Sequence, residues 1–163
     1  MNIYGFIVFS LLVACNLKGP EIPSVDKDLP DVLSKITYDS VQAAAWGADQ
    51  YGMKQYVLVF LKAGPNRSQD SLTRANLQKA HMENITRLAN EGKLILAGPM
   101  MDDGEIRGIY VFDVRSLEEA RALTETDPAI QAGSLVLEMH PWYCSAALME
   151  IPRLHKKGVK KDI

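Results

Sequence analysis

The sequence predicts an α+β fold of the ferredoxin-like kind, with elements in the order β-α-β-β-α-β. Residues 55–63 form an apolar, β-branched run, which is typical of a strand buried on both faces. Two segments with helical character, 70–90 and 116–124, each begin with residues that favour a helix N-cap. Three further strands are indicated by shorter apolar runs at residues 94–97, 108–114 and 135–139.

The end of the first strand and both ends of the long helix are marked by residues that favour turns and caps. Gly64-Pro65-Asn66 ends the strand, Asp70 or Ser71 opens the helix, and Gly92 stops it. Apolar side chains recur at helical spacing, so one stripe is expected to face the core. This stripe comprises Leu77, Ala80, His81, Ile85 and Leu88, whereas Arg74, Gln78, Glu83, Arg87 and Asn90 are expected to face water.

Turn and cap residues also mark the elements in the second half of the predicted domain. Asp102-Asp103-Gly104 favours a hairpin turn between the second and third strands, with glycine supplying a positive φ. Ser116 and Glu119 form a capping box at the start of the second helix. One more helical turn is expected at 128–132, and the last strand is expected to continue from Met139 into residues 140–143.

A ferredoxin-like sheet carries its helices on one face only. With strands this apolar, the other face would expose an apolar surface. Burial against a second copy is the economical solution, so a homodimer is expected, with the two sheets packed as a dimeric α+β barrel.

The N-terminus resembles a bacterial lipoprotein signal. Residues 3–14 are an apolar run of signal-peptide length, too short to cross a bilayer. Leu12-Val13-Ala14-Cys15 resembles a lipobox, in which the signal ends before a cysteine that becomes lipidated. We therefore expect a signal at 1–14, a lipid on Cys15 and a Pro-containing flexible tether at 15–36. The protein would be anchored to a bacterial membrane in the cell envelope, facing the periplasm or the exterior.

The remaining regions are a helical extension at 37–53, a main domain at 54–150 and a basic tail at 151–163. Trp46 and Tyr51 are expected to anchor the extension by packing. The tail is interpreted as solvated and poorly ordered, with weak attraction to anionic lipid headgroups as the alternative. If Cys15 carries lipid, Cys144 has no partner in the chain, and we expect it to be buried or half-buried.

The composition excludes several functions. A formal net charge of −2 suggests no general affinity for nucleic acid. The sequence contains neither a glycine-rich phosphate loop nor a Cys-x-x-Cys or His-Glu-x-x-His pattern. No cofactor and no metal are therefore expected.

Several motifs in sequence order resemble the YCII-related (YciI-like) family over residues 55–144. They are Ala80-His81-Met82, Glu91 to Pro99, Ser116 to Ala120, Thr126-Asp127-Pro128 and Ala132-Gly133. The resemblance implies a dimeric α+β barrel with a proposed His–Asp active site, which corresponds here to His81 and Asp127. Most members of the family that the sequence resembles have no established reaction, so the resemblance names no reaction for this chain. The best-known enzymatic relative is a dehydrochlorinase that acts on a chlorinated aromatic ring.

Two interpretations stand for each candidate residue. His81 is either a core-edge histidine satisfied by one hydrogen bond or a base held in one tautomer by a carboxylate. Asp127 is either an N-cap before Pro128 or the partner of His81, and one carboxylate can do both.

Further candidate ligand-binding residues lie at or near the predicted ends of strands. His140 is either an interface residue or part of a ligand-pocket rim, with Trp142 as an aromatic wall. Gly98 and Pro99 either make a tight turn or let the backbone approach a ligand.

We expect a small-molecule enzyme that transfers protons through His81 and Asp127, of a lyase or isomerase type. The alternative is a non-catalytic lipoprotein that binds a small ligand or a protein partner at the cell envelope.

Overall fold

The structure is a computed structural model that describes residues 31, 35–67 and 70–160. The predicted signal, Cys15 and most of the predicted tether lie outside the described residues. Asp39 onward belongs to one compact unit, which is described below. Among the described residues, no helix has both the length and the apolar character needed to cross a membrane.

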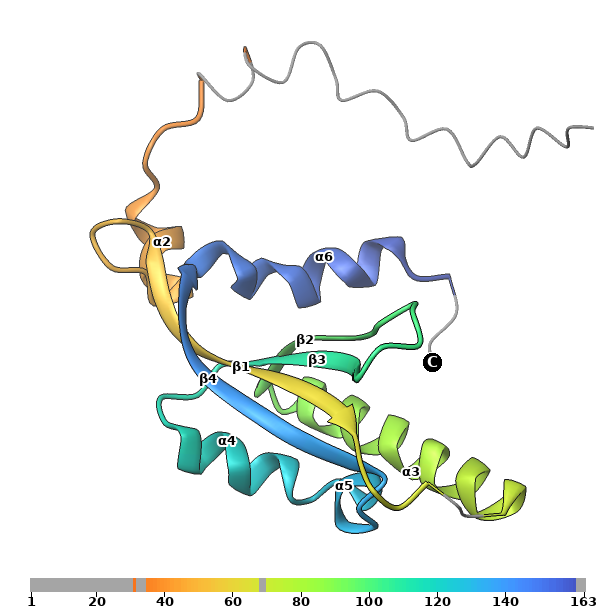
Figure 1. The fold of residues 1–163 in the computed structure, drawn as a ribbon. Coiled ribbons are helices and arrows are strands. Elements are labelled where there is room, and N and C mark those ends of the chain that lie inside the picture. The colour runs from red at the N-terminus through yellow and green to blue at the C-terminus, as the bar shows by residue number, and fades with distance from the viewer. Residues whose placement is uncertain (1–30, 32–34, 68–69, 161–163) are drawn as a thin grey trace, which may run out of the picture. The chain divides into compact units, whose positions relative to one another are not determined.

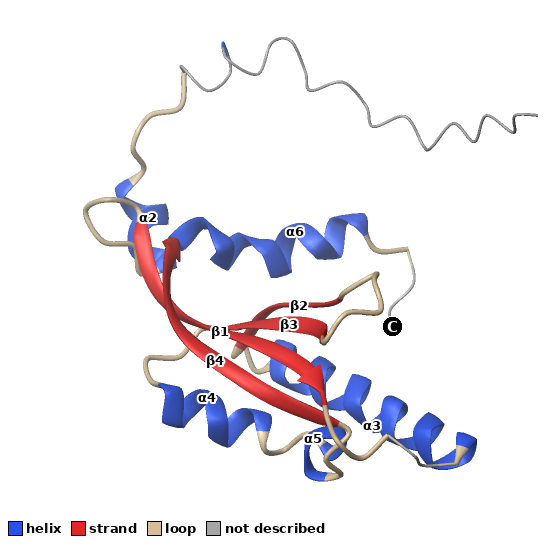
Figure 2. Cartoon of the chain, in the orientation of Figure 1, coloured by secondary structure: helices blue, strands red, loops and turns tan. Residues whose placement is uncertain are grey.

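Four antiparallel strands form one sheet in the order β2-β3-β1-β4. With the helices between them, they confirm the predicted ferredoxin-like β-α-β-β-α-β order (Figure 2). The last strand is longer than its apolar run, because it pairs with the first along its whole length and continues through Pro141. Proline is tolerated there because β4 is an edge strand. The bounds are β1 (Met53–Ala63), β2 (Leu94–Pro99), β3 (Ile106–Phe112) and β4 (Leu135–Ser145).

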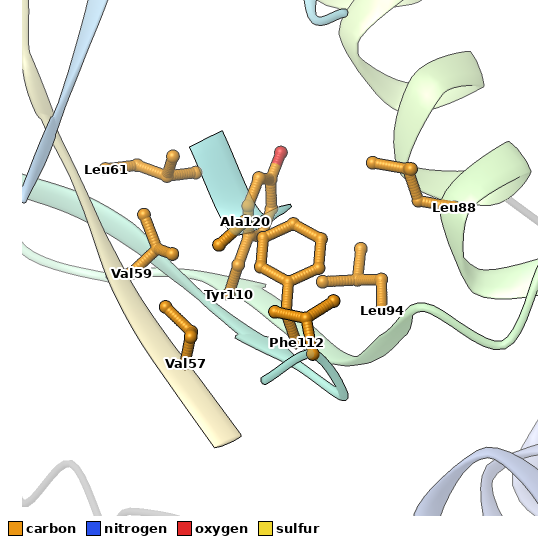
Figure 3. Close-up of a cluster of buried hydrophobic side chains, with 9 residues drawn as sticks. Val57, Val59, Leu61, Leu88, Leu94, Tyr110, Phe112 and Ala120 are labelled. Carbon is orange, nitrogen blue, oxygen red and sulfur yellow. The ribbon is translucent and has the colours of Figure 1, made fainter. Parts of the chain in front are cut away.

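Three helices cover one face of this sheet (Figure 1). They are α3 (Ser71–Asn90), α4 (Leu117–Thr124) and α5 (Pro128–Gln131). Each begins at the predicted cap, where the side chains of Asp70, Ser116 and Asp127 accept backbone N–H groups. The core between helices and sheet, much of it drawn in Figure 3, consists of Val57, Val59, Leu61, Leu88, Leu94, Tyr110, Phe112, Val114 and Ala120.

A short helix precedes the sheet, as predicted. Helix α2 (Ser40–Trp46) is capped by Asp39 and ends at Gly47, whose φ of 70° suits glycine. Trp46 anchors α2 by donating its indole N–H to Glu150 over 3.1 Å. The prediction that Tyr51 is a second anchor is wrong, because that side chain is 75% exposed.

The second face of the sheet is not bare, which corrects the expectation of helices on one face only. A 3-10 helix, η1 (Ala146–Glu150), and helix α6 (Ile151–Gly158) cross this face on the side opposite α3 and α4 (Figure 1). Leu148 and Met149 of η1 pack against the buried side chains of the second face, and α6 contacts β2. The interpretation of residues after 150 as a poorly ordered tail is therefore wrong for α6.

The structure predicts a large effect at Gly64. A Cβ there would lie 2.2 Å from the carbonyl oxygen of Gly133, and neither backbone yields easily because Gly64 N–H is hydrogen-bonded to the Ser134 carbonyl. We expect Gly64→Ala to lower the free energy of unfolding by at least about 2 kcal/mol in urea denaturation. Gly98→Ala is the control, since its Cβ would meet nothing within 4 Å. Equal effects of the two substitutions would contradict the prediction.

Candidate active site

His81 and Asp127, predicted as a pair, are brought together by the fold. His81 lies on α3 and Asp127 on the loop before α5, and the two helices lie side by side on one sheet face. The Nδ1 atom of His81 is 2.6 Å from Oδ2 of Asp127. The carboxylate is fully buried, whereas the His81 side chain retains 11% exposure. The pair therefore combines a short charge-assisted contact with limited access from solvent.

Asp127 plays both of the roles considered for it. Its Oδ1 atom accepts the backbone N–H of Ala129 over 2.9 Å and so caps α5. Its other oxygen, Oδ2, accepts from Nδ1 of His81. This arrangement favours the tautomer with the proton on Nδ1, which leaves the Nε2 lone pair of a neutral ring available as a base.

Tyr110 is a third member of the site that the sequence did not single out. It lies on β3, is buried, and stacks beside the His81 ring at 6.2 Å between centroids. Its hydroxyl oxygen is 3.4 Å from Oδ2 of Asp127 and 3.5 Å from Nε2 of His81. Burial and the neighbouring Asp127 carboxylate raise the pKa of Tyr110 well above its usual value. Tyr110 therefore presents a neutral hydroxyl, which restricts the orientation of both partners.

A polar network next to the pair was also missed. Arg87 of α3 donates through Nη2 to Asn84 Oδ1 and to Thr126 Oγ1, each over 2.8 Å. Thr126 immediately precedes Asp127, so the network ties the loop that carries Asp127 to the helix that carries His81. Within the described residues, the buried Nδ2 of Asn84 has no hydrogen-bond partner.

A cleft of about 270 Å³ opens beside the pair. Its walls come from α3, from the segment after β1 and from the turn between α5 and β4. His81 contributes to the wall, and so does Ala129, whose N–H binds Asp127. At this volume the cleft lies just below the roughly 300–1,000 Å³ that is typical of small-molecule sites. Its lining residues are Arg67, Arg74, Leu77, Gln78, His81, Ala129, Ser134 and Leu135.

The other predicted ligand-binding residues do not line this cleft. His140 lies on β4, opposite Leu58, on the sheet face away from the core strand residues Val57 and Val59. There it is half exposed and hydrogen-bonded to Glu138 over 2.9 Å.

Trp142 lies on the same face as His140 and packs against Tyr56, with 6.3 Å between ring centroids. Gly98 and Pro99 lie at the end of β2, where they pair with Ile109 and Gly108 of β3.

Two remaining expectations concern cysteine and metal. Cys144 is half-buried on β4, as predicted. Across residues 31, 35–67 and 70–160, no three His, Cys, Asp or Glu side chains gather closely enough to hold a metal ion.

Comparison with known proteins decides the family. The YCII-related domain matches residues 56–143, more than half of the chain. The chain belongs to the YCII-related family. A relative of this YCII-related protein, the uncharacterized protein YjpA of Bacillus subtilis strain 168, is 37% identical over 62 residues, which are 38% of this chain and 71% of YjpA.

One solved structure also resembles the YCII-related protein. It is the 5-chloro-2-hydroxyhydroquinone dehydrochlorinase from Burkholderia phenoliruptrix AC1100, in complex with 2,5-dihydroxybenzoquinone. The identity is 20% and the TM-score 0.43, over 53% of this chain and 92% of that chain.

The buried tyrosines of the YCII-related protein predict a loss of stability at alkaline pH. Burial, with smaller contributions from Asp113 and Cys144, raises the pKa of Tyr56 to about 12. An unfolded tyrosine titrates near 10. The stabilisation that Tyr56 provides is therefore complete below about pH 10 and is lost as the pH rises through about 12.

Urea denaturation between these pH values should show the free energy of unfolding falling as pH rises, and falling less steeply in Tyr56→Phe. The exposed Tyr51→Phe is the matched control. A slope that is the same in wild type and in Tyr56→Phe would contradict the assignment.

Proposed function

We propose that the protein is a small-molecule enzyme in which His81 acts as general base and acid, oriented by Asp127. The observation that supports this proposal is the 2.6 Å contact between the buried Asp127 and His81, which lines a cleft of about 270 Å³. A purely structural histidine would need the hydrogen bond but not the cleft.

The proposed reaction follows from the hydrogen bond between His81 and Asp127. The Nδ1–H of His81 donates to Asp127, so Nε2 takes a proton from a C–H or O–H group of the bound ligand. The imidazolium that forms is stabilised by the buried carboxylate. The proton then returns to a different ligand atom, which is an isomerisation, or stays on His81 while a leaving group departs with the electron pair, which is an elimination.

Proton exchange with solvent tests this function across many compounds at once, so the natural substrate need not be identified first. The full chain is incubated in D₂O with a panel of ketones, 2-oxo acids and chlorinated phenols, and proton NMR follows the replacement of acidic hydrogens by deuterium. Chloride release is measured in parallel. We expect exchange or chloride release with at least one compound. Compounds that bind, remain unchanged and bind equally to His81→Gln would instead favour a non-catalytic ligand-binding protein.

We also propose that the protein is a homodimer. Although η1 and α6 cover part of the second sheet face, some apolar side chains on it stay partly exposed. Phe60 and Ile109 are half-buried, and Val136 is 41% exposed. A second copy placed on this surface would bury it. Light scattering of the full chain should give the mass of a dimer, and Phe60→Glu should shift it toward the monomer. A monomeric wild type at high concentration would overturn this proposal.

The cell-envelope location is likewise a proposal. The sequence before Cys15 supports lipidation of that residue and attachment to a bacterial membrane. Labelling of a bacterial expression host with radioactive palmitate should mark the wild type but not Cys15→Ser. Equal labelling, or none in either, would refute it.

A further inference from the structure

The cleft beside His81 carries an unbalanced positive charge. Arg67 and Arg74 both belong to its lining, and no aspartate or glutamate does. In the part of the chain that the structure describes, neither guanidinium forms an ion pair, whereas Arg87 and Arg153 pair with Glu91 and Glu150. Two carboxylates stand close to this region but neither lines the cleft. Asp127 is fully buried and bound to His81 and to the start of α5, and Asp70, the cap of α3, accepts from Leu72 and Thr73.

Arg67 directly follows Asn66, a residue held by three hydrogen bonds. Asn66 donates its backbone N–H to the Gly133 carbonyl over 3.1 Å, and its Nδ2 donates to the Ala132 carbonyl, also over 3.1 Å. Ser134 returns a hydrogen bond from its hydroxyl to the Asn66 carbonyl over 3.1 Å. These contacts hold the segment before Arg67 against the turn between α5 and β4. Arg67 is thereby kept at the cleft although it lies in a loop.

Arg74 is positioned by helix geometry. Arg74, Gln78 and His81 lie at intervals of four and three residues, which places them on one face of α3. The helical rise puts the Cα atoms of Arg74 and His81 about 10 Å apart. Leu77 lies between them on that face, and Leu135 of β4 supplies a second apolar contact in the cleft. Along α3, the cleft therefore presents first the cation of Arg74, then the apolar side chain of Leu77, and finally the base, His81.

We propose that the ligand of this site carries an oxyanion, a carboxylate or a phosphate, which Arg67 and Arg74 bind while its carbon skeleton packs against Leu77 and Leu135. Guanidinium groups match the planar oxygen pair of a carboxylate and also bind phosphate oxygens. The bound anion places the reacting C–H or O–H group of the same molecule toward Nε2 of His81. This inference rests on the proposed function for the role of His81, but the anion site itself is tested by binding alone.

Matched probes separate the charge of the ligand from its shape. Phenylacetate and benzylphosphonate carry an oxyanion, and phenylacetamide is a neutral analogue of the first. Binding of each to the full chain is measured at millimolar concentrations by ligand-observed NMR and by thermal shift, at low and high salt. We expect at least one anion to bind roughly tenfold more tightly than the amide, with a preference that weakens as salt increases.

Substitution of the arginines assigns the preference to the cleft. In Arg67→Gln or Arg74→Gln, the tenfold preference for the anion should largely disappear, whereas Arg121→Gln on α4 removes the same charge away from the cleft and should keep it. A ratio of carboxylate to phosphonate affinity tells which oxyanion the site prefers, and either result supports the proposal.

Three outcomes would overturn the anion site. They are equal affinity for anion and amide, an anion preference that survives in both cleft variants, and no binding of either anion. None of these depends on turnover. If anion binding holds but His81→Gln leaves proton exchange unaltered, the proposed function fails and the anion site stands.

Discussion

His81→Gln should reduce the rate of proton exchange by about 10² to 10⁴-fold on any compound that the wild type exchanges. Glutamine keeps a polar side chain on α3 but provides no basic nitrogen. Because the general base is lost while the cleft remains, the effect should fall on kcat much more than on KM. The rate of deuterium incorporation, measured at several substrate concentrations, gives both values.

His155→Gln is the control, because that histidine lies exposed on α6 and outside the cleft. Circular dichroism and urea denaturation should show that His81→Gln is folded. A folded His81→Gln with wild-type turnover would exclude His81 as the base and leave it with a structural role.

Asp127→Ala should lower the free energy of unfolding by about 3–5 kcal/mol, because it breaks a buried charged pair. The substitution removes the acceptor for the Ala129 N–H and the partner of His81 in a fully buried place. Asp127→Asn should cost much less stability, because the amide oxygen still accepts from Ala129. It should nevertheless reduce proton exchange by a factor similar to that of His81→Gln. Its NH₂ group faces Nδ1 and favours the tautomer in which Nε2 carries the proton.

The exposed cap of α3 provides the comparison. Asp70 accepts the N–H groups of Leu72 and Thr73, as a cap without a histidine partner. Asp70→Ala should cost about 1 kcal/mol and leave exchange intact. If Asp127→Ala costs no more than Asp70→Ala, and Asp127→Asn retains full exchange, Asp127 is a cap and nothing else.

The elements that could be predicted are those with local causes. Asp70, Ser116 and Asp127 were recognisable as caps because a short acceptor side chain stood before each helical segment. The pairing of His81 with Asp127 needed one step more. It depended on the ferredoxin-like order, which places α3 and the segment containing α5 on one face, and on the resemblance to the family.

The features that could not be predicted depend on strand register and on distant contacts. Tyr110 lies within an apolar run, and only the pairing of β3 with β1 brings its hydroxyl to Asp127. Arg74 is exposed, as helical spacing predicted, but its place at a cleft could not be predicted, because helical spacing alone cannot show that Arg67 lines the same cleft. The charged residues after Glu150 suggested a tail. The contacts that η1 and α6 make with the sheet join segments far apart in the sequence, so no local pattern indicated them.

The Trp46–Glu150 contact has a practical consequence for spectroscopy. The sequence has two tryptophans, Trp46 and Trp142, and neither lines the cleft. Trp46 is bound to Glu150, and Trp142 packs in the cluster that includes Leu148 and Met149. Intrinsic fluorescence will therefore monitor the docking of the C-terminal segment onto the sheet, while occupancy of the cleft stays optically silent and requires a label or a magnetic-resonance signal.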